Sequence, residues 1–72
     1  IIVISDFYYL ESANNLKTDL ENKNKIKDIS IKKINNNRYR LFTGPFENFK
    51  ALKNTYISLN NLGFDALNVY NE

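Results

Sequence analysis

The first third of the chain changes from one hydrophobic period to another. Residues 1–5 are mostly β-branched, which predicts a strand. Over residues 12–23 the apolar positions recur at helical spacing, and Ser12 is placed to accept a hydrogen bond from a free amide of the first turn. The apolar positions of this predicted helix are Ala13, Leu16 and Leu20. The pattern therefore indicates a strand followed by a short amphipathic helix.

The middle of the chain has the pattern of a β-hairpin. Isoleucines separated by polar residues predict a strand over residues 28–34, and residues 38–43 predict the return strand. Three asparagines at 35–37 tolerate left-handed backbone, which favours a turn between the two strands. Gly44 and Pro45 end the second strand, because proline cannot donate to a strand ladder.

The last third predicts another helix and another strand. Apolar residues recur at helical spacing over 48–61, Asn48 is placed to cap them, and Gly63 followed by Phe64 is typical of a left-handed helix stop. Residues 65–70 predict the last strand. The helical apolar positions are Phe49, Leu52, Tyr56 and Leu59. The order β-α-β-β-α-β predicts an α+β fold, with a four-stranded antiparallel sheet and both helices on one face, as in ferredoxin-like domains.

A sheet covered on one side divides its strand residues into two sets, because successive side chains point to opposite faces. The set predicted to face the helices is Ile2, Ile4, Ile29, Ile31, Leu41, Thr43, Leu67 and Val69. The set predicted for the open face is Val3, Ser5, Arg38, Arg40, Phe42, Asn68 and Tyr70. A register shifted by one residue would exchange Phe42 and Leu41 between these faces.

Composition excludes several kinds of chemistry. The 72 residues fit one small domain, and 43% hydrophobic content is enough for a core. Without histidine or cysteine, the chain has no imidazole-assisted nucleophile and no thiolate or imidazole metal site. Acids that can serve in glycoside cleavage occur without a spacing that brings two together: Asp6, Asp28, Glu47 and Asp65. We expect a domain that is not an enzyme and that needs no cofactor or metal.

The formal charge of +2 is modest but unevenly placed. Basic residues dominate between positions 22 and 46, which predicts one basic edge. These residues are Lys23, Lys25, Lys27, Lys32, Lys33, Arg38 and Arg40. The same order of elements occurs in RNA-recognition domains, which stack bases on strand aromatics. This alternative stays open, although the third strand lacks the signature of that family and +2 is weak for a phosphate binder.

The predicted open face combines a flat aromatic with forked hydrogen-bond donors. Val3 and Phe42 are apolar, yet they share this face with Arg38 and Arg40. An aromatic ring packs on the C–H face of a sugar, while guanidinium groups donate to its hydroxyl and acetamido oxygens. Asp6 either accepts from a sugar hydroxyl or caps the loop that follows. Tyrosines at the strand exit are predicted to form a rim over the core: Tyr8 and Tyr9.

Residues 39–46 (YRLFTGPF) resemble the Tyr-Arg-Val-x-Val-Gly-Pro-Phe segment of the SPOR (sporulation-related repeat) family. The resemblance covers nearly the whole chain and includes Leu59, Gly63 and the segment that leads into the final strand. In the first strand Val3 stands where the family has a sugar-contacting glutamine, and Ser5 replaces a glycine. Phe7 matches the family's phenylalanine, and Gly-Pro-Phe is interpreted as a structural turn.

The resemblance implies a domain that binds peptidoglycan glycan strands lacking stem peptides. The residues assigned to this binding are Val3, Ser5, Asp6, Arg38, Arg40, Phe42 and Asn68. It further implies a monomer in the periplasm or cell envelope, enriched at the division septum, without a nucleic-acid partner and without membrane contact by this segment. Because the chain begins with Ile1, we expect the C-terminal piece of a longer protein. The first candidate parent is a septal lytic transglycosylase of the rare lipoprotein A type, followed by an amidase or a membrane-anchored division protein.

Overall fold

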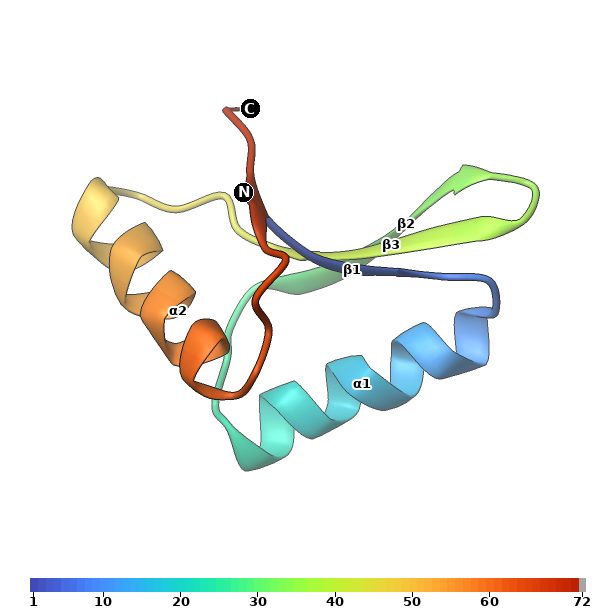
Figure 1. The fold of residues 1–72 in the computed structure, drawn as a ribbon, viewed down its shortest axis with the longest axis horizontal. Helices are drawn as coiled ribbons and strands as arrows, with labels where there is room; N and C mark the ends of the chain where they lie inside the picture. The colour runs from blue at the N-terminus through green and yellow to red at the C-terminus, as the bar shows by residue number, and fades with distance from the viewer. Residues whose placement is uncertain (72) are drawn as a thin grey trace.

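A computed structural model describes residues 1–71 and confirms the predicted α+β fold. The four strands form one antiparallel sheet in the order β2-β3-β1-β4. Both helices lie on the same side of this sheet (Figure 1). The elements are β1 (Ile2–Phe7), α1 (Leu10–Lys23), β2 (Ile29–Asn35), β3 (Arg38–Thr43), α2 (Phe49–Asn61) and β4 (Asn68–Val69).

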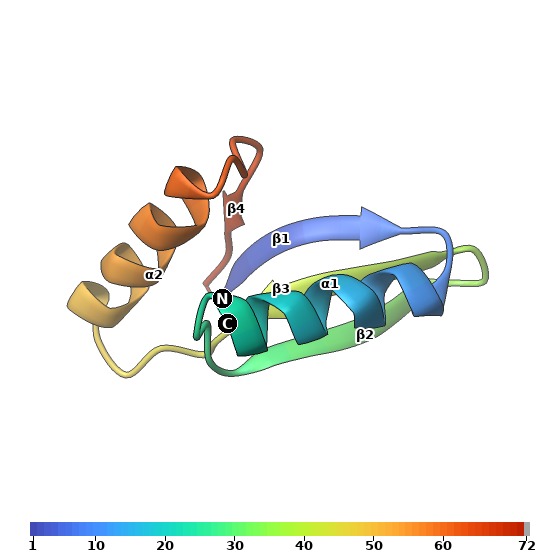
Figure 2. The same cartoon turned by 90° about the horizontal axis from the view of Figure 1, so that it is seen from below.

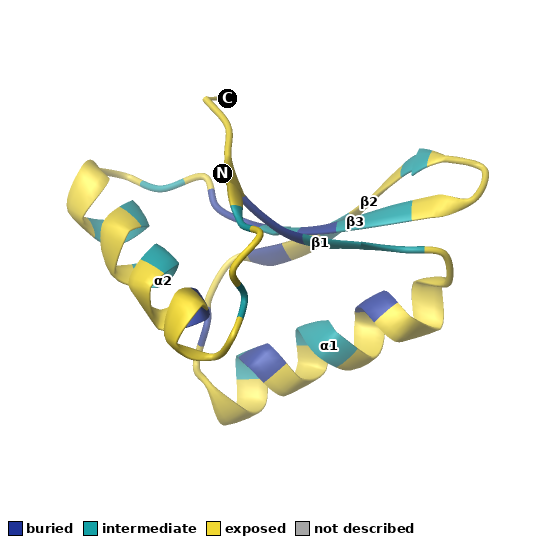
Figure 3. Cartoon of the chain, viewed as in Figure 1, coloured by how far each residue is buried: buried dark blue, intermediate teal, exposed yellow. Residues whose placement is uncertain are grey.

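The core lies between the sheet and the two helices. Helix α1 runs along β1, β2 and β3, whereas α2 lies toward the β4 end (Figure 2). The buried positions follow the inner faces of these elements and leave the outer helix faces exposed (Figure 3). The central cluster consists of Ile2, Ile4, Leu20, Ile26, Ile29, Leu41 and Leu59. The predicted assignment of Leu41 to the core is thereby confirmed.

A bulge in β1 changes which residues share a face. Val3 pairs with Phe42, but the next paired residue, Ser5, stands opposite Leu41, so Ile4 is an extra residue in the strand. The extra residue shifts the alternation and brings Asp6 opposite Arg40. The simple period-2 expectation, which placed Ser5 on the open face, was wrong in this half of β1, where Asp6 takes that place.

Helix α1 begins two residues before its predicted start. Tyr9 is the N-cap, with extended backbone and no side-chain cap hydrogen bond. Its carbonyl accepts a hydrogen bond from the Ala13 amide at 3.3 Å, so Ser12 already lies inside the first turn. The predicted capping role of Ser12 was therefore wrong. The predicted inner face of the helix is confirmed, since Ala13 and Leu20 are buried.

The hairpin between β2 and β3 forms at the predicted place with a different backbone. The left-handed non-glycine residues are Lys25 and Asp28, with φ of 58° and 57°, and none of the asparagines at 35–37 is among them. The Asn35 side-chain oxygen accepts a hydrogen bond from the Asn37 amide at 2.9 Å. This side-chain bond braces the turn, because asparagine can replace a backbone acceptor within two residues.

The end of β3 is tied to neighbouring segments at Gly44. Its φ of 120° lies in the region that favours glycine, and a Cβ there would stand 3.1 Å from the Ile1 Cα atom. The Gly44 amide donates to the Asp28 carbonyl at 3.1 Å. Thr43, which is buried beside it, donates its hydroxyl to the Lys27 carbonyl at 2.7 Å. Phe46 packs against the core.

Helix α2 has the predicted signals at both ends. The Asn48 side chain accepts from the Ala51 amide at 2.8 Å. At the other end Gly63 has a φ of 104°, and the Phe64 amide donates to the Leu59 carbonyl at 3.2 Å. Phe64 also packs against the core. The predicted cap and the predicted left-handed stop are both confirmed.

Two apolar residues near the C-terminal half are more exposed than the pattern predicted. Phe49, the first residue of α2, is 75% exposed, because the face of α2 that meets the core passes through Leu52, Tyr56 and Leu59. Val69, assigned to the core, is 50% exposed. It lies in β4, a two-residue edge strand with a neighbouring strand on one side only. The predicted strand over 65–70 is correspondingly shorter.

Candidate functional site

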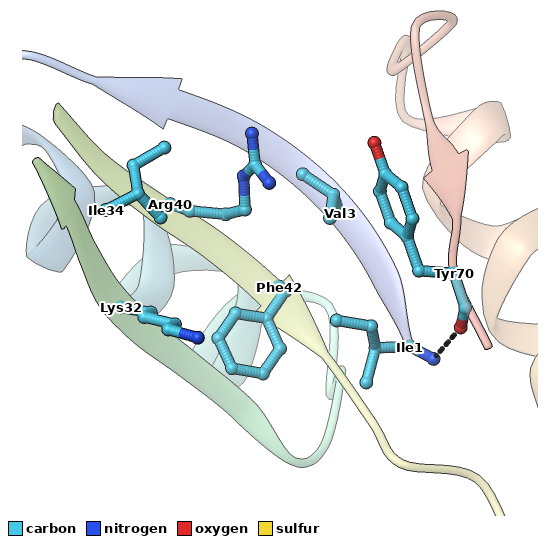
Figure 4. A pocket seen from close by; sticks show the side chains of 7 residues that line it. All are labelled: Ile1, Val3, Lys32, Ile34, Arg40, Phe42 and Tyr70. Carbon is cyan, nitrogen blue, oxygen red and sulfur yellow. Dashed lines mark hydrogen bonds between the residues drawn. The ribbon is translucent and has the colours of Figure 1, made fainter. Parts of the chain in front are cut away.

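The open face of the sheet carries a groove of about 230 Å³. Figure 4 shows Phe42 near its centre, with Arg40 extending toward β1 and the Tyr70 ring reaching in beside β4. The Tyr70 amide donates to the Ile1 carbonyl at 2.9 Å, which holds Tyr70 at this rim. The groove is lined by Ile1, Val3, Lys32, Ile34, Arg40, Phe42 and Tyr70.

The floor of the groove is apolar. Val3 and Phe42 stand opposite each other on β1 and β3. Val3 is only 6% exposed, although no helix covers this side of the sheet, whereas Phe42 is half-buried. Val3 therefore lies under its neighbours in the floor, and Phe42 presents the aromatic surface that a ligand can contact.

Arg40 is held at the groove wall by an acidic side chain from the neighbouring strand. Its Nε donates to Asp6 Oδ1 at 2.9 Å, and its Nη2 donates to Asp6 Oδ2 at 3.1 Å. The side chains of Arg40 and Asp6 are 32% and 26% exposed, so the pair is partly shielded from water. A guanidinium group has five N–H donors. The pairing uses two of these donors and neutralises the charge of Arg40, while the others stay free for a ligand.

The same pairing predicts a pH dependence of stability. Hydrogen bonds from Arg40 lower the pKa of the Asp6 carboxyl below its ordinary value of 3.8, against the opposing effect of burial. A carboxyl with a lowered pKa in the folded state stabilises the fold above its unfolded pKa. That stabilisation is lost as the pH falls below about 4 and through the lowered pKa. We expect Asp6→Asn to melt below the wild type at about pH 6 and close to it at about pH 2.

Thermal melts of both proteins at the two pH values measure this difference. Asp65→Asn is the matched control, because Asp65 is exposed and forms no ion pair among residues 1–71. A melting difference between wild type and Asp6→Asn that stayed constant between the two pH values would contradict the prediction.

The structure brings together only part of the predicted site. Val3, Arg40 and Phe42 line the groove, and Asp6 reaches it through its pairing with Arg40. Arg38 is exposed and lines a separate hollow of about 140 Å³ at the hairpin end of the sheet, together with Asp6 and aromatic residues.

The other predicted site residues lie outside the groove lining. Ser5 is half-buried opposite Leu41, and Asn68 is exposed opposite Val3. Tyr8 and Tyr9, predicted to cover the core, are instead 69% and 74% exposed. They follow β1, where the chain turns outward before α1 begins.

Four of the lining residues were absent from the predicted site, among them Tyr70, which was placed on the open face without a role. Lys32 follows the core residue Ile31 and stands opposite Arg40, so alternation alone assigns it to the open face. Ile34 lies at an irregularity of the β2–β3 register, which no local pattern indicates. The lining residues absent from the predicted site are Ile1, Lys32, Ile34 and Tyr70.

In the part of the chain that the structure describes, neither acidic clusters nor long apolar helices add a second kind of site. Within residues 1–71, no three acidic side chains gather where they can hold a metal ion. In the same part of the chain, no helix has the length and apolar character needed to cross a bilayer. The chain matches no protein-family model, no curated protein and no solved structure. The function is therefore inferred from the geometry of the groove.

Proposed function

We propose that this domain binds peptidoglycan glycan strands that lack stem peptides, through the groove on its open face, without catalysing a reaction. The observation that carries the proposal is the combination of the half-buried Phe42 ring, which lines the groove, with the paired Arg40 guanidinium. A sugar ring can stack its C–H face on Phe42 while its oxygens accept from the free donors of Arg40. The resemblance of residues 39–46 to SPOR domains supports the same ligand.

The size and openness of the groove fit several weak contacts along a strand. Each neutral hydrogen bond contributes about 0.5–1.5 kcal/mol net. A groove of about 230 Å³ holds only a small part of a polymer at one time. Binding to an extended glycan therefore adds contacts from Tyr70 and Lys32 at the groove walls to the stacking on Phe42.

The electrostatics of the groove favour a sugar over RNA. Asp6 neutralises Arg40, which leaves Lys32 as the cationic side chain of the lining without an acidic partner among residues 1–71. A nucleic acid carries a phosphate for every nucleotide, and binding it relies on several cationic contacts. An RNA would instead bind the basic hairpin, which is the β2–β3 hairpin with Lys32, Lys33 and Arg38.

Within the proposal, the domain brings a longer parent protein to the division septum. Glycan strands without stem peptides are expected to be enriched at the septum. The domain would therefore act in the periplasm or cell envelope. A lytic transglycosylase of the rare lipoprotein A type is the first candidate parent, with an amidase or a division protein next.

Pelleting with insoluble peptidoglycan tests the ligand class. We expect retention of the domain to increase when an amidase removes the stem peptides, and to persist when salt rises from about 50 mM to 200 mM. RNA binding through several phosphate contacts would fall steeply over that range.

Two outcomes of the pelleting experiment contradict the proposal. Equal retention on intact and stripped walls would show that stem-peptide removal is not recognised. Retention that disappears with salt, together with salt-sensitive binding to single-stranded RNA, would assign the binding to the basic hairpin instead.

A further inference from the structure

We infer that Lys32 recognises a carboxylate on the glycan, namely the lactyl carboxylate that a muramic acid residue exposes once its stem peptide has been removed. This inference rests on the proposed function and names the group by which that groove distinguishes stripped from intact strands.

The first observation is a row of three charges across the open face. In the sheet register Lys32 of β2 stands opposite Arg40 of β3, and Arg40 stands opposite Asp6 of β1. Like charges directly opposite each other on neighbouring strands are destabilising. Asp6 compensates Arg40 through two hydrogen bonds, and within residues 1–71 no carboxylate forms an ion pair with Lys32. An anion bound beside Lys32 would balance the positive charge that Asp6 leaves uncompensated in this row.

The second observation is the position of Lys32 relative to the aromatic floor. Lys32 lines the groove, and Figure 4 shows its side chain lying beside Phe42 on the side opposite Ile1. A sugar stacked on Phe42 would direct its substituents toward the groove walls. A carboxylate on a short ether-linked arm is the substituent that an ammonium group can bind there.

The chemistry of the polymer supplies the reason for selectivity. In an intact strand the lactyl carboxyl is joined to the stem peptide through an amide bond, and so it carries no charge. Cleavage of that bond releases a carboxylate on the sugar itself. A cation at the groove wall therefore favours the stripped strand, because the lactyl carboxyl of the intact strand is an uncharged amide and cannot form an ion pair.

Soluble stripped glycan strands and the same strands with their lactyl carboxyls converted to primary amides test this inference directly. We expect the wild-type domain to bind the carboxylated strands about threefold to fivefold more tightly than the amidated ones, the range of an exposed ion pair. Lys32→Gln should lose this preference and should bind both strands with the affinity that the wild type has for the amidated form.

Lys33→Gln is the matched control. Lys33 has the same charge and is exposed on the same edge strand, but it pairs opposite Tyr39 and does not line the groove. Lysines on edge strands also protect against aggregation, and both variants remove that protection equally. We expect Lys33→Gln to keep the wild-type preference and both variants to melt with the wild type.

The outcomes separate this inference from the function on which it rests. Equal wild-type binding to both strands, or the same behaviour of the two lysine variants, would overturn the role of Lys32 and leave glycan binding standing. Failure of the wild type to bind either strand would overturn the proposed function itself.

Discussion

Leu41→Ala is expected to lower the free energy of unfolding by about 2–5 kcal/mol. Leu41 is fully buried in β3, the strand that pairs with both β1 and β2, and it belongs to the central hydrophobic cluster. Removing its side chain leaves a cavity beneath the middle of the sheet, where the backbone cannot relax without breaking ladder hydrogen bonds. Total stabilities of small domains are about 5–15 kcal/mol, so the variant loses a large part of its stability.

Urea and thermal unfolding of the wild type and of Leu41→Ala measure this loss. Leu41→Ile is the companion variant, because it keeps the buried volume and should cost less than about 1.5 kcal/mol. If Leu41→Ala melted with the wild type, β3 would have to present its other face to the helices.

Phe42→Ala is expected to weaken binding to stripped glycan about tenfold or more. Phe42 stands next to Leu41 in the chain, but a strand directs the two side chains to opposite faces, and Phe42 lies in the groove. The variant removes the stacking surface from the centre of the proposed site. Because Phe42 is half-buried and stands opposite the buried Val3, the Phe42→Ala variant also loses some stability, though clearly less than Leu41→Ala.

Wall pelleting of the folded variant, with a thermal melt of the same sample, separates binding from stability. Phe42→Tyr is the control, because it keeps an aromatic ring and should retain most of the binding. Full retention by Phe42→Ala at the wild-type level would show that the groove is not the binding surface. Loss of binding by Phe42→Tyr as severe as that of Phe42→Ala would argue against stacking.

Local patterns were sufficient for the order and type of the elements. The alternation in the predicted strands and the helical spacing over 48–61 depend on neighbours within a few residues, where the chain itself sets side-chain direction. The cap at Asn48 and the stop at Gly63 are equally local, since each satisfies free backbone groups of its own helix. The same alternation correctly placed Leu41 inside and Phe42 outside.

Expectations failed where the result depended on packing between distant segments. Ser12 was predicted as a cap, but α1 begins earlier because the chain after β1 reaches helical geometry at Leu10. Phe49 fits the helical pattern and is nevertheless exposed, because that pattern does not reveal how far the sheet extends over α2. Val69 is exposed because β4 is a short edge strand, a property of the whole sheet.

The candidate site likewise has one part that the sequence determines and one part that depends on the tertiary structure. The sequence alone determined that Phe42 and Arg40 share the open face, because both lie in one regular strand at positions i and i+2. Only the tertiary structure decided that Asp6, 34 residues away, pairs with Arg40 and neutralises it. That contact requires the bulge at Ile4, which reverses the alternation in the second half of β1, and a bulge is defined by the pairing of two strands and not by either strand alone.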